Sequence, residues 1–578
     1  MKNKFLNLTC PQKAILDMEN FYPNTSMNTI TGKISIHDKV NFSLLKKAIL
    51  LFVENTDNIR YRLHINQDTV TQYEENFEPF IIDHIKLTSE NEEETSDKIA
   101  RKVFNLYDSP LYYFATFQNP DLTGGFFVCV HHVIADAWAM SMLISTIISI
   151  YSKLLKKETI NYTDDFSYAD FVAQENDYLQ SSKFKQDATF WDELFGENIF
   201  ENAYTKPITS SLPCLAKRAE FALSQKMTKQ IVDFCKQIKV SCFTFILFAM
   251  GIYESRIKQT DSIVLSAPIL NRSSKKDKQT FGLFVNNMLY KLNIKDNTTF
   301  YDAITKLNKS QFSYLRHQKY PLQTLITNLK NKFNTKENIY DTSVSYQNAR
   351  TNHELDNVTY DSKWLFSGFS AVSLLFHIYD MDDTNNLSFI YDYQENSYQY
   401  SQIKAIHNRL LYIIKQIIQN QNILIKDIEL VTQQEKDKLL NEFNQTYIKY
   451  DTSKTVLDLW EKQVLLHPKK SAVICDKKEF SYQEVDTLSN HFASLLQQKY
   501  HITKGHNLSI VLDRSVDLVV VILAVLKCGC SYVLIDPEHP NDRKDYMIKN
   551  SNSQFVISNL DLEFPNVIHF NTVFNVTT

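Results

Sequence analysis

Glycine is scarce in this chain, and the spacing of the few glycines excludes the common glycine-rich nucleotide sites. Only nine occur in 578 residues, at positions 32, 124, 125, 196, 251, 282, 368, 505 and 529. Neither a GxGxxG dinucleotide turn nor a GxxxxGK phosphate loop can be written with glycines at these positions. The sequence therefore lacks a glycine-rich loop to hold nucleotide phosphates.

Cysteine pairs and unbalanced charge are also lacking. The eight cysteines contain no CxxC pair, and the spacing of Cys528 and Cys530 is typical of neither a zinc site nor a disulfide framework, so we expect reduced thiols and no metal. The 62 basic and 66 acidic residues are intermixed, and the net charge is -4. Because this leaves no basic patch, nucleic acid is not an expected partner.

Long hydrophobic runs are absent as well. The longest purely apolar stretch, residues 518–526, is much shorter than the roughly 20 residues that a membrane-spanning helix needs. The first residues, Met1 to Lys4, lead into no secretory core. We therefore expect no membrane span and a cytoplasmic protein. Its 44% hydrophobic content and its length are sufficient for three or four compact units.

The first 430 residues or so mix helical and strand patterns, which predicts an α+β architecture. We expect helices over residues 40–53, 137–157, 183–194, 229–239, 244–253 and 401–419, and one more after the acidic stretch 89–97. We expect strands over residues 59–65, 111–117, 125–130, 262–266, 287–292, 342–346, 372–379 and 387–393.

A change of pattern follows the polar residues 432–454, which we interpret as a connector. From there strands and helices alternate strictly, which predicts a parallel sheet in a separate unit. The expected strands are 471–475, 508–512, 531–535 and 554–558, with helices over 483–498, 516–527 and 541–550.

Two adjacent histidines, His131 and His132, follow an apolar strand, and Asp136 stands four residues beyond His132. This places an imidazole at the end of a sheet, where the next helix begins, and suits general base catalysis. A second interpretation is purely structural: His131 is a core histidine bonded to backbone, and Asp136 caps the following helix, which is worth about 1 kcal/mol. Spacing alone leaves both interpretations open.

The segment from His131 to Ala137 resembles the HHxxxDG motif of nonribosomal peptide synthetase condensation domains. Further segments resemble that family's other motifs in the family's order, which makes chance agreement improbable. They are Pro11 to Ile15, Asn58 to Arg60, Pro268 to Arg272, Gly282 to Asn286, His317 to Pro321 and Ser345 to Asn348. The resemblance implies a two-lobed chloramphenicol acetyltransferase-like fold, with lobes over residues 1–175 and 176–431 and a linker over 432–454.

The family resemblance also implies an activity: amide formation between a donor acyl thioester and the amine of an aminoacyl group on a pantetheine arm. By this match His132 is the catalytic base and His131 supports it. Asp136 pairs with an arginine of the second lobe, for which Arg272 is the candidate. Buried pairs of this kind fix geometry more than they stabilise.

Other residues are assigned by the same resemblance. Gly282, Asn286, Gln347 and Asn348 are expected to line a substrate tunnel, although such amides also commonly satisfy backbone groups at strand ends. Trp138 is a further tunnel candidate, with packing at the helix start as the interpretation that we favour. Ala137 replaces the glycine of the motif and adds a methyl group close to the catalytic imidazole. Activity would fall if the backbone there needed a positive φ, or if the acceptor had to pass closely.

The C-terminal residues 455–578 resemble the opening portion of adenylation, or AMP-binding, domains. The matching segments are Phe480 to Val485 and Leu526 to Pro537. The family's phosphate loop, its residue for the amino acid's amine and its late lysine have no counterpart here, so we interpret this portion as truncated and expect no adenylation from it.

The match begins near Met1, and residues 21–28 resemble starter condensation domains, which take a fatty acyl group from coenzyme A or an acyl carrier. An epimerisation domain would need a carrier upstream. The expected partners are an aminoacyl carrier protein in trans, the acyl donor and the remainder of a split synthetase, in lipopeptide or antibiotic biosynthesis, with no covalently bound cofactor. The alternatives are a downstream subunit that receives a peptidyl chain from another protein's carrier, a catalytically silent fragment or scaffold of a synthetase, and a free-standing acyltransferase that uses coenzyme A.

Overall fold

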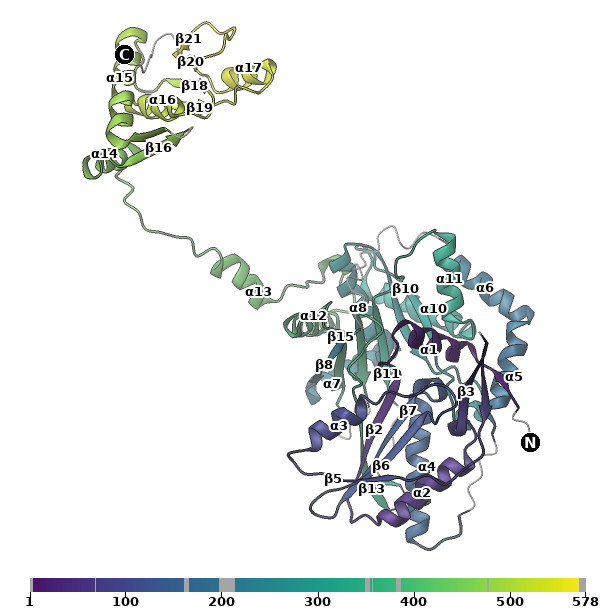
Figure 1. Ribbon diagram of the computed structural model, residues 1–578. Coiled ribbons are helices and arrows are strands. Elements are labelled where there is room, and N and C mark those ends of the chain that lie inside the picture. Colours follow the sequence, from purple (N-terminus) through teal and green to yellow (C-terminus); the bar gives the residue numbers. More distant parts are fainter. Residues whose placement is uncertain are drawn as a thin grey trace. The chain divides into compact units, whose positions relative to one another are not determined.

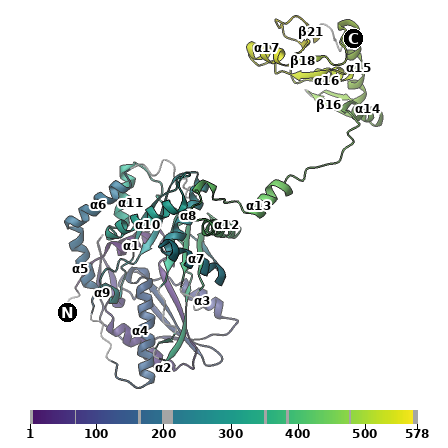
Figure 2. The same ribbon diagram turned by 180° about the vertical axis from the view of Figure 1, so that it is seen from behind.

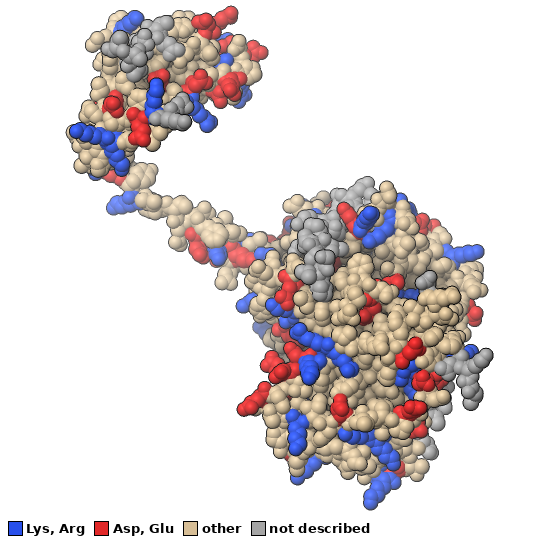
Figure 3. All heavy atoms as spheres, in the orientation of Figure 1, with Lys and Arg blue, Asp and Glu red and all other residues tan. Residues whose placement is uncertain are grey.

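A computed structural model describes residues 4–67, 69–160, 166–196, 214–348, 354–355, 357–380, 386–475 and 478–570. The chain divides into two compact units, Met1–Leu440 and Asn441–Thr578, and each is considered by itself (Figure 1). On the face of each unit that Figure 3 shows, acidic and basic side chains are interspersed.

The first unit contains two six-stranded sheets, one in each lobe. The sheet of the first lobe has the order β12-β13-β2-β7-β6-β5. Its strands are β12 (Glu354–Leu355), β13 (Val358–Leu365), β2 (Thr29–Ile36), β7 (Gly124–His131), β6 (Tyr112–Gln118) and β5 (Asp83–Lys86). Around it lie β1 (Leu6–Asn7), β3 (Tyr61–Asn66), β4 (Thr69–Glu74), α1 (Cys10–Phe21), α2 (Phe42–Asn55), α3 (Glu92–Ala100), α4 (Ala137–Leu155) and α5 (Tyr168–Leu179).

Strand β7 is buried on both faces, which accounts for its uninterrupted apolar sequence. Phe126 and Val128 belong to the main core of the lobe, whereas Phe127 and Cys129 point to a smaller cluster that contains Ile99 of α3. The alternation follows from the two-residue period of a strand. Helix α3 begins at Glu92, inside the acidic stretch 89–97 rather than after it, so the expected start of this helix was wrong.

Helices α2 and α4 cover the face of this sheet that is in front in Figure 2. Within the described ranges, Ala137–Leu155 is the one helix long and apolar enough to cross a membrane, and half of that stretch is buried inside the protein. Leu143 and Ile147 of this helix are fully buried with Ile49 of α2 in the core of the first lobe. The apolar composition of α4 is thus explained by its packing.

The sheet of the second lobe has the order β10-β9-β11-β14-β15-β8, with parallel pairing of β11 to both of its neighbours. Its strands are β8 (Ala216–Ala222), β9 (Ser262–Ile269), β10 (Asn286–Asn293), β11 (Thr342–Gln347), β14 (Leu374–Tyr379) and β15 (Ser388–Gln394). The helices are α6 (Ser182–Leu194), α7 (Gln225–Ile238), α8 (Cys242–Lys258), α9 (Lys275–Gln279), α10 (Phe300–Arg316), α11 (Leu322–Lys332) and α12 (Tyr400–Gln419).

The chain crosses between the lobes in a way that the sequence pattern did not predict. Strand β13 falls within the range expected for the second lobe, yet it pairs with β2 of the first, Tyr360 opposite Ile36. Phe281 and Phe284, which follow α9, are buried in the core of the first lobe. Segments of the later half of the unit therefore complete the earlier half.

The second unit contains a parallel sheet of the order β19-β18-β20-β21, as the alternating pattern predicts. The first expected strand, Ser471–Cys475 (β16), is not part of it, because it pairs antiparallel with β17 (Lys478–Ser481). The other elements are α14 (Val456–Leu466), α15 (Tyr482–Tyr500), β18 (Asn507–Val511), α16 (Val516–Lys527), β19 (Ser531–Leu534), α17 (Asn541–Asn550), β20 (Phe555–Ser558) and β21 (Val567–His569).

The expected connector is not structureless. It begins with a short helix, α13 (Gln433–Asp437), whose capping residue Thr432 accepts from the backbone of Glu435, and Lys438–Glu442 continues as a π-helical turn. Polar composition alone did not distinguish such short helical turns from a loop.

Candidate functional site

The two histidines lie where β7 ends and the chain turns toward α4. His131 is the last residue of the strand, His132–Ile134 form a single 3-10 turn, and Asp136 caps α4 by accepting from the backbone N–H of Ala139 at 2.8 Å. The structural role that we weighed for Asp136, a helix cap, is therefore present. It does not exclude a further role, because the carboxylate has a second oxygen.

A closed set of hydrogen bonds surrounds His132 without involving its ring. Its backbone N–H donates to the carbonyl of Asn28 at 2.7 Å, and the Asn28 amide donates to Glu19 Oε1 at 2.7 Å. His131 lies 3.2 Å from the same oxygen through Nε2, and its Nδ1 accepts from Val133 N–H at 3.2 Å. Because Nδ1 accepts, the ring proton of His131 is on Nε2 and donates to Glu19.

Sequence reasoning missed Glu19 and Asn28. Both are buried, at 8% and 4% exposed, although both side chains are polar. A buried carboxylate needs hydrogen-bond partners, and His131 and Asn28 supply them to Glu19. Glu19 has no signal in the sequence, and the resemblance of residues 21–28 to starter domains does not single out Asn28 for this contact. Both lie about a hundred residues from His131, and only the fold brings them together.

The imidazole of His132 is half-buried, and its buried Nδ1 has no hydrogen-bond partner within the described part of the chain. Burial lowers the pKa of His132 below its ordinary value of 6.5, while nearby backbone carbonyls and the Asp136 carboxylate act in the opposite direction. The ring is therefore neutral at pH 7, the protonation state that a general base needs.

Asp136 and Arg272 form a fully buried ion pair between the two lobes. Arg272 Nη2 lies 3.1 and 3.2 Å from the two carboxylate oxygens, and both side chains are 0% exposed. The Oδ2 atom also accepts from the backbone N–H groups of Phe284 and Val285, at 2.9 and 3.2 Å. These bonds satisfy a charge that would otherwise be costly to bury.

The loop after β9 holds Arg272 in place. The guanidinium of Arg272 donates to the carbonyls of Asp277, Thr280 and Gly282. It also stacks on the Phe284 ring, with 3.9 Å from Cζ to the ring centroid. Gly282 has a φ of +155°, and a Cβ there would lie 2.3 Å from the Tyr168 ring. Gly282 thus allows close approach of backbone to an aromatic ring.

Two of the other matching segments also converge on the histidine turn. Gln12 donates through Nε2 to the carbonyl of Val133 at 3.1 Å, and Asn58 donates to the carbonyl of Ile134 at 2.7 Å. Both side chains are fully buried. Their side-chain amides donate hydrogen bonds to backbone carbonyls of the histidine turn, which is too short to provide donors for these carbonyls itself.

The remaining candidates have mostly structural contacts. Asn286 donates to the carbonyls of Gln318 and Tyr320 at 2.9 Å each, which is the strand-end role that we had weighed against tunnel lining. Gln347 bonds Ser345, and Asn348 is exposed just after β11. None of these three contacts the histidine turn through a hydrogen bond given for the described residues.

Ala137 and Trp138 begin α4. Ala137 is exposed and helical and has no positive φ, so the backbone strain that would have lowered activity is not present. Trp138 donates through Nε1 to the carbonyl of Lys278 in α9 at 3.0 Å. It therefore ties the first lobe to the loop that carries Arg272.

Two lobes that each contain a six-stranded sheet, joined through a buried Asp–Arg pair beside a histidine turn, define a chloramphenicol acetyltransferase-like fold. The condensation domain family matches residues 2–440, and the AMP-binding enzyme family matches residues 460–572. The chain belongs to the condensation domain family, and the match to the AMP-binding enzyme family follows it along the chain.

Curated relatives are peptide synthetases. The chain is 27% identical over 574 residues to surfactin synthase subunit 1 from Bacillus subtilis, and 24% identical over 570 residues to gramicidin S synthase 2 from Brevibacillus brevis. The alignments cover 98% and 96% of this chain, which spans only 16% and 12% of the respective relatives.

Solved structures agree in fold. A four-domain nonribosomal peptide synthetase bound to AMP and glycine matches all of this chain and 45% of its own, with a TM-score of 0.80 and 13% identity. A mutant starter condensation domain of rhizomide synthetase, in complex with C8-CoA, matches 74% of this chain and 98% of its own, with a TM-score of 0.65 and 17% identity.

Proposed function

We propose that residues 1–431 catalyse amide formation between a donor acyl thioester and the α-amine of an aminoacyl group carried on a pantetheine arm. The observation that carries this proposal is the half-buried imidazole of His132, kept neutral at the end of β7 and held by bonds to its backbone and its neighbours. Family membership and the ordered motifs support the same reaction.

The reaction needs little from the base. The α-amine nitrogen attacks the thioester carbonyl carbon, the C–S bond breaks, and pantetheine or coenzyme A leaves as a thiol while one amine proton is transferred. An amine of pKa near 8 is partly neutral at pH 7. His132 accepts the proton as the tetrahedral centre forms, and alignment of the two reactants supplies much of the acceleration.

The other site residues act on geometry. Asp136 and Arg272 are positioning residues, because both side chains are fully buried and bonded to protein groups. Glu19, Asn28 and His131 position the histidine turn. In this proposal Trp138 positions the Arg272 loop from α4.

For the donor we propose a fatty acyl group, on coenzyme A or an acyl carrier, and for the acceptor an aminoacyl carrier protein in trans. The resemblance of residues 21–28 to starter domains supports this choice, and a solved relative of the same fold was obtained with C8-CoA. For the location we propose a reducing, cytoplasmic compartment, because the eight cysteines have no spacing typical of a disulfide framework.

We further propose that residues 455–578 do not adenylate an amino acid by themselves. They contain two glycines, Gly505 and Gly529, and therefore no glycine-rich phosphate loop. ATP–pyrophosphate exchange with a panel of amino acids tests this proposal, and any exchange above a no-enzyme control would contradict it.

The test of amide formation is intact-mass analysis of a loaded aminoacyl carrier protein after incubation with the full chain and a panel of acyl-CoA donors. We expect the carrier to gain the mass of one acyl group. No gain above the His132→Ala control would favour the silent scaffold. Acylation of a free amine without any carrier protein would favour the free-standing acyltransferase.

A further inference from the structure

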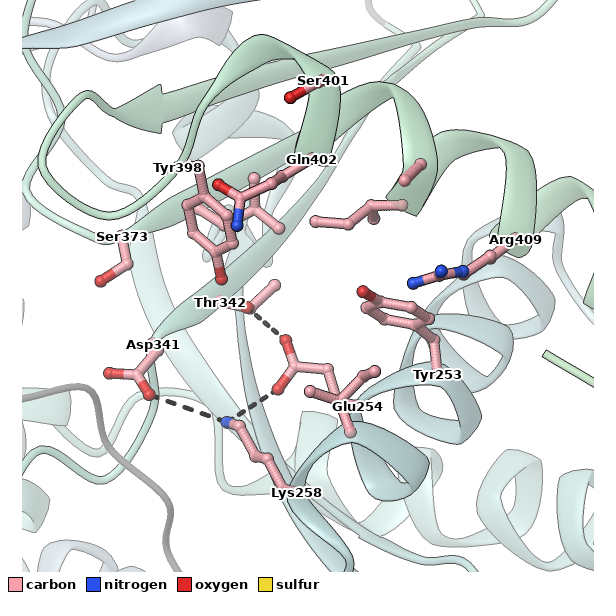
Figure 4. A pocket seen from close by; sticks show the side chains of 14 residues that line it. Tyr253, Glu254, Lys258, Asp341, Thr342, Ser373, Tyr398, Ser401, Gln402 and Arg409 are labelled. Atoms are coloured by element: carbon pink, nitrogen blue, oxygen red, sulfur yellow. Dashed lines mark hydrogen bonds and ion pairs between the residues drawn. The ribbon is translucent and has the colours of Figure 1, made fainter. Parts of the chain in front are cut away.

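A cavity of about 400 Å³ lies in the second lobe, between α8, the start of β11 and the N-terminal half of α12 (Figure 4). Its lining includes no residue of the histidine turn and neither member of the Asp136–Arg272 pair. Volumes of this size are typical of sites for small ligands. The amide-forming reaction proposed above does not use it.

One wall of the cavity carries two carboxylates and one ammonium. Lys258 Nζ lies 2.8 Å from Glu254 Oε2 and 3.7 Å from Asp341 Oδ2. Burial acts against the charge of this ammonium, but the two carboxylates prevail and raise the pKa of Lys258. The wall therefore has an excess of one negative charge, although Glu254 is only 6% exposed.

The opposite wall presents a guanidinium. Arg409 Nη2 pairs with Glu435 at 2.9 Å, whereas its buried Nε has no hydrogen-bond partner within the described ranges. Figure 4 shows Arg409 and the hydroxyl of Tyr253 pointing into the cavity from the side opposite Asp341. An acceptor group of a ligand would satisfy this donor, whose burial without a partner is otherwise unfavourable.

Apolar and aromatic side chains also line the cavity. They include Ile257, Leu374, Tyr398 and Ile406. In Figure 4 the hydroxyl of Tyr398 and the amide of Gln402 also point inward. The cavity thus offers carboxylates on one side, a hydrogen-bond-donating cation on the opposite side, and apolar side chains in its lining.

We propose that this cavity binds a small zwitterion with an apolar body, such as a free amino acid with an aromatic or aliphatic side chain. The ammonium group lies against Asp341 and Glu254, the carboxylate accepts from Arg409, and the side chain contacts Ile257, Leu374 and Tyr398. Binding is non-covalent and independent of His132.

Isothermal titration calorimetry of the full chain tests the proposal with L-phenylalanine, L-leucine, 2-phenylethylamine and 3-phenylpropanoate. We expect both amino acids to bind. The amine without a carboxylate and the acid without an amine each lose one charge-assisted contact, so each should bind at least about tenfold more weakly. Absence of binding by both amino acids, or equal binding of all four compounds, would overturn the proposal.

Matched variants locate the binding. Arg409→Gln removes the guanidinium, whereas Glu435→Gln breaks the same ion pair from outside the cavity. We expect binding to weaken at least about tenfold in the first variant and to persist in the second. Equal losses in both would show that Arg409 acts only by holding α13, and would overturn the assignment.

Two further variants keep the test decisive. Asp341→Asn, at the other end of the cavity, should also weaken binding. This variant tests the proposal even if Arg409→Gln fails to fold. His132→Ala should leave the affinity unchanged. Loss of binding in His132→Ala would place the amino acid in the amide-forming site and overturn the proposal, whereas amide formation itself is tested separately on the carrier protein.

Discussion

Replacing Asp136 by asparagine should destabilise the first unit far more than the loss of a single surface ion pair. Its side chain accepts five contacts: two from Arg272 and one each from the backbone of Ala139, Phe284 and Val285. An asparagine retains one acceptor oxygen, but its NH₂ group would face a donor. Removing one partner of a buried pair leaves a buried charge, at a cost of about 3–5 kcal/mol.

Urea unfolding followed by tryptophan fluorescence measures this loss, since Trp138, Trp191 and Trp364 all lie in the first unit. Asp170→Asn is the matched control. It breaks an exposed pair of 2.6 Å between α5 and Lys276 of the same Arg272 loop, with side chains 54% and 42% exposed, and should cost at most about 1 kcal/mol. Equal destabilisation by the two variants would refute the reasoning.

Three further predictions concern the turn, the loop and the second lobe. Glu19→Ala should lower kcat about tenfold with little change in KM, because His131 and Asn28 lose their hydrogen-bond acceptor. Glu19→Gln keeps an acceptor oxygen and should restore kcat. A wild-type kcat in Glu19→Ala would contradict the positioning role. Gly282→Ala should lower the free energy of unfolding by about 1–3 kcal/mol, because it forces a methyl group onto the Tyr168 ring. Gly32→Ala, whose added methyl group would have contacts no closer than 3.4 Å, should lower it less. The same urea unfolding assay compares the two variants, and equal losses would argue against a steric role. Burial lowers the pKa of His407 to about 4, so the folded state disfavours its charged form, and stability should fall as the pH drops through 6.5 toward 4, by about 3 kcal/mol. A His407→Phe variant should lack this part of the pH dependence of urea unfolding, and an unchanged dependence would show that other groups cause it.

Much of the fold is predictable from periodicity because the strongest patterns coincide with burial. The stretch that became β7 is apolar at every position since both of its faces are covered, and α4 is apolar because it packs in the core. Prediction failed where local pattern and tertiary pairing differ. Nothing in residues 358–365 indicates that β13 joins the sheet of the other lobe, and nothing in 471–475 indicates antiparallel pairing with β17.

The site shows the same division. The spacing of His131, His132 and Asp136 marks the turn, and the ordered motifs suggested Arg272, which the structure places against Asp136. Glu19 belongs to no motif, and the matching segment 21–28 does not indicate a role for Asn28 at the histidine turn, because the contacts of both residues form only in the fold. Ala137 departs from the motif, and its helical backbone removes the expected strain, whereas the prediction that its methyl group obstructs a closely passing acceptor stays a prediction.

The most direct test of the central claim is the single-turnover rate of amide formation, compared between the wild-type chain and His132→Ala. The donor and the loaded carrier protein are both used at concentrations above their dissociation constants. A positioned general base contributes typically about 10²–10⁴-fold. We predict a fall in rate approaching this range, with some residual rate because the two reactants are still aligned. A His132→Ala variant that forms the amide as fast as the wild type would contradict the account.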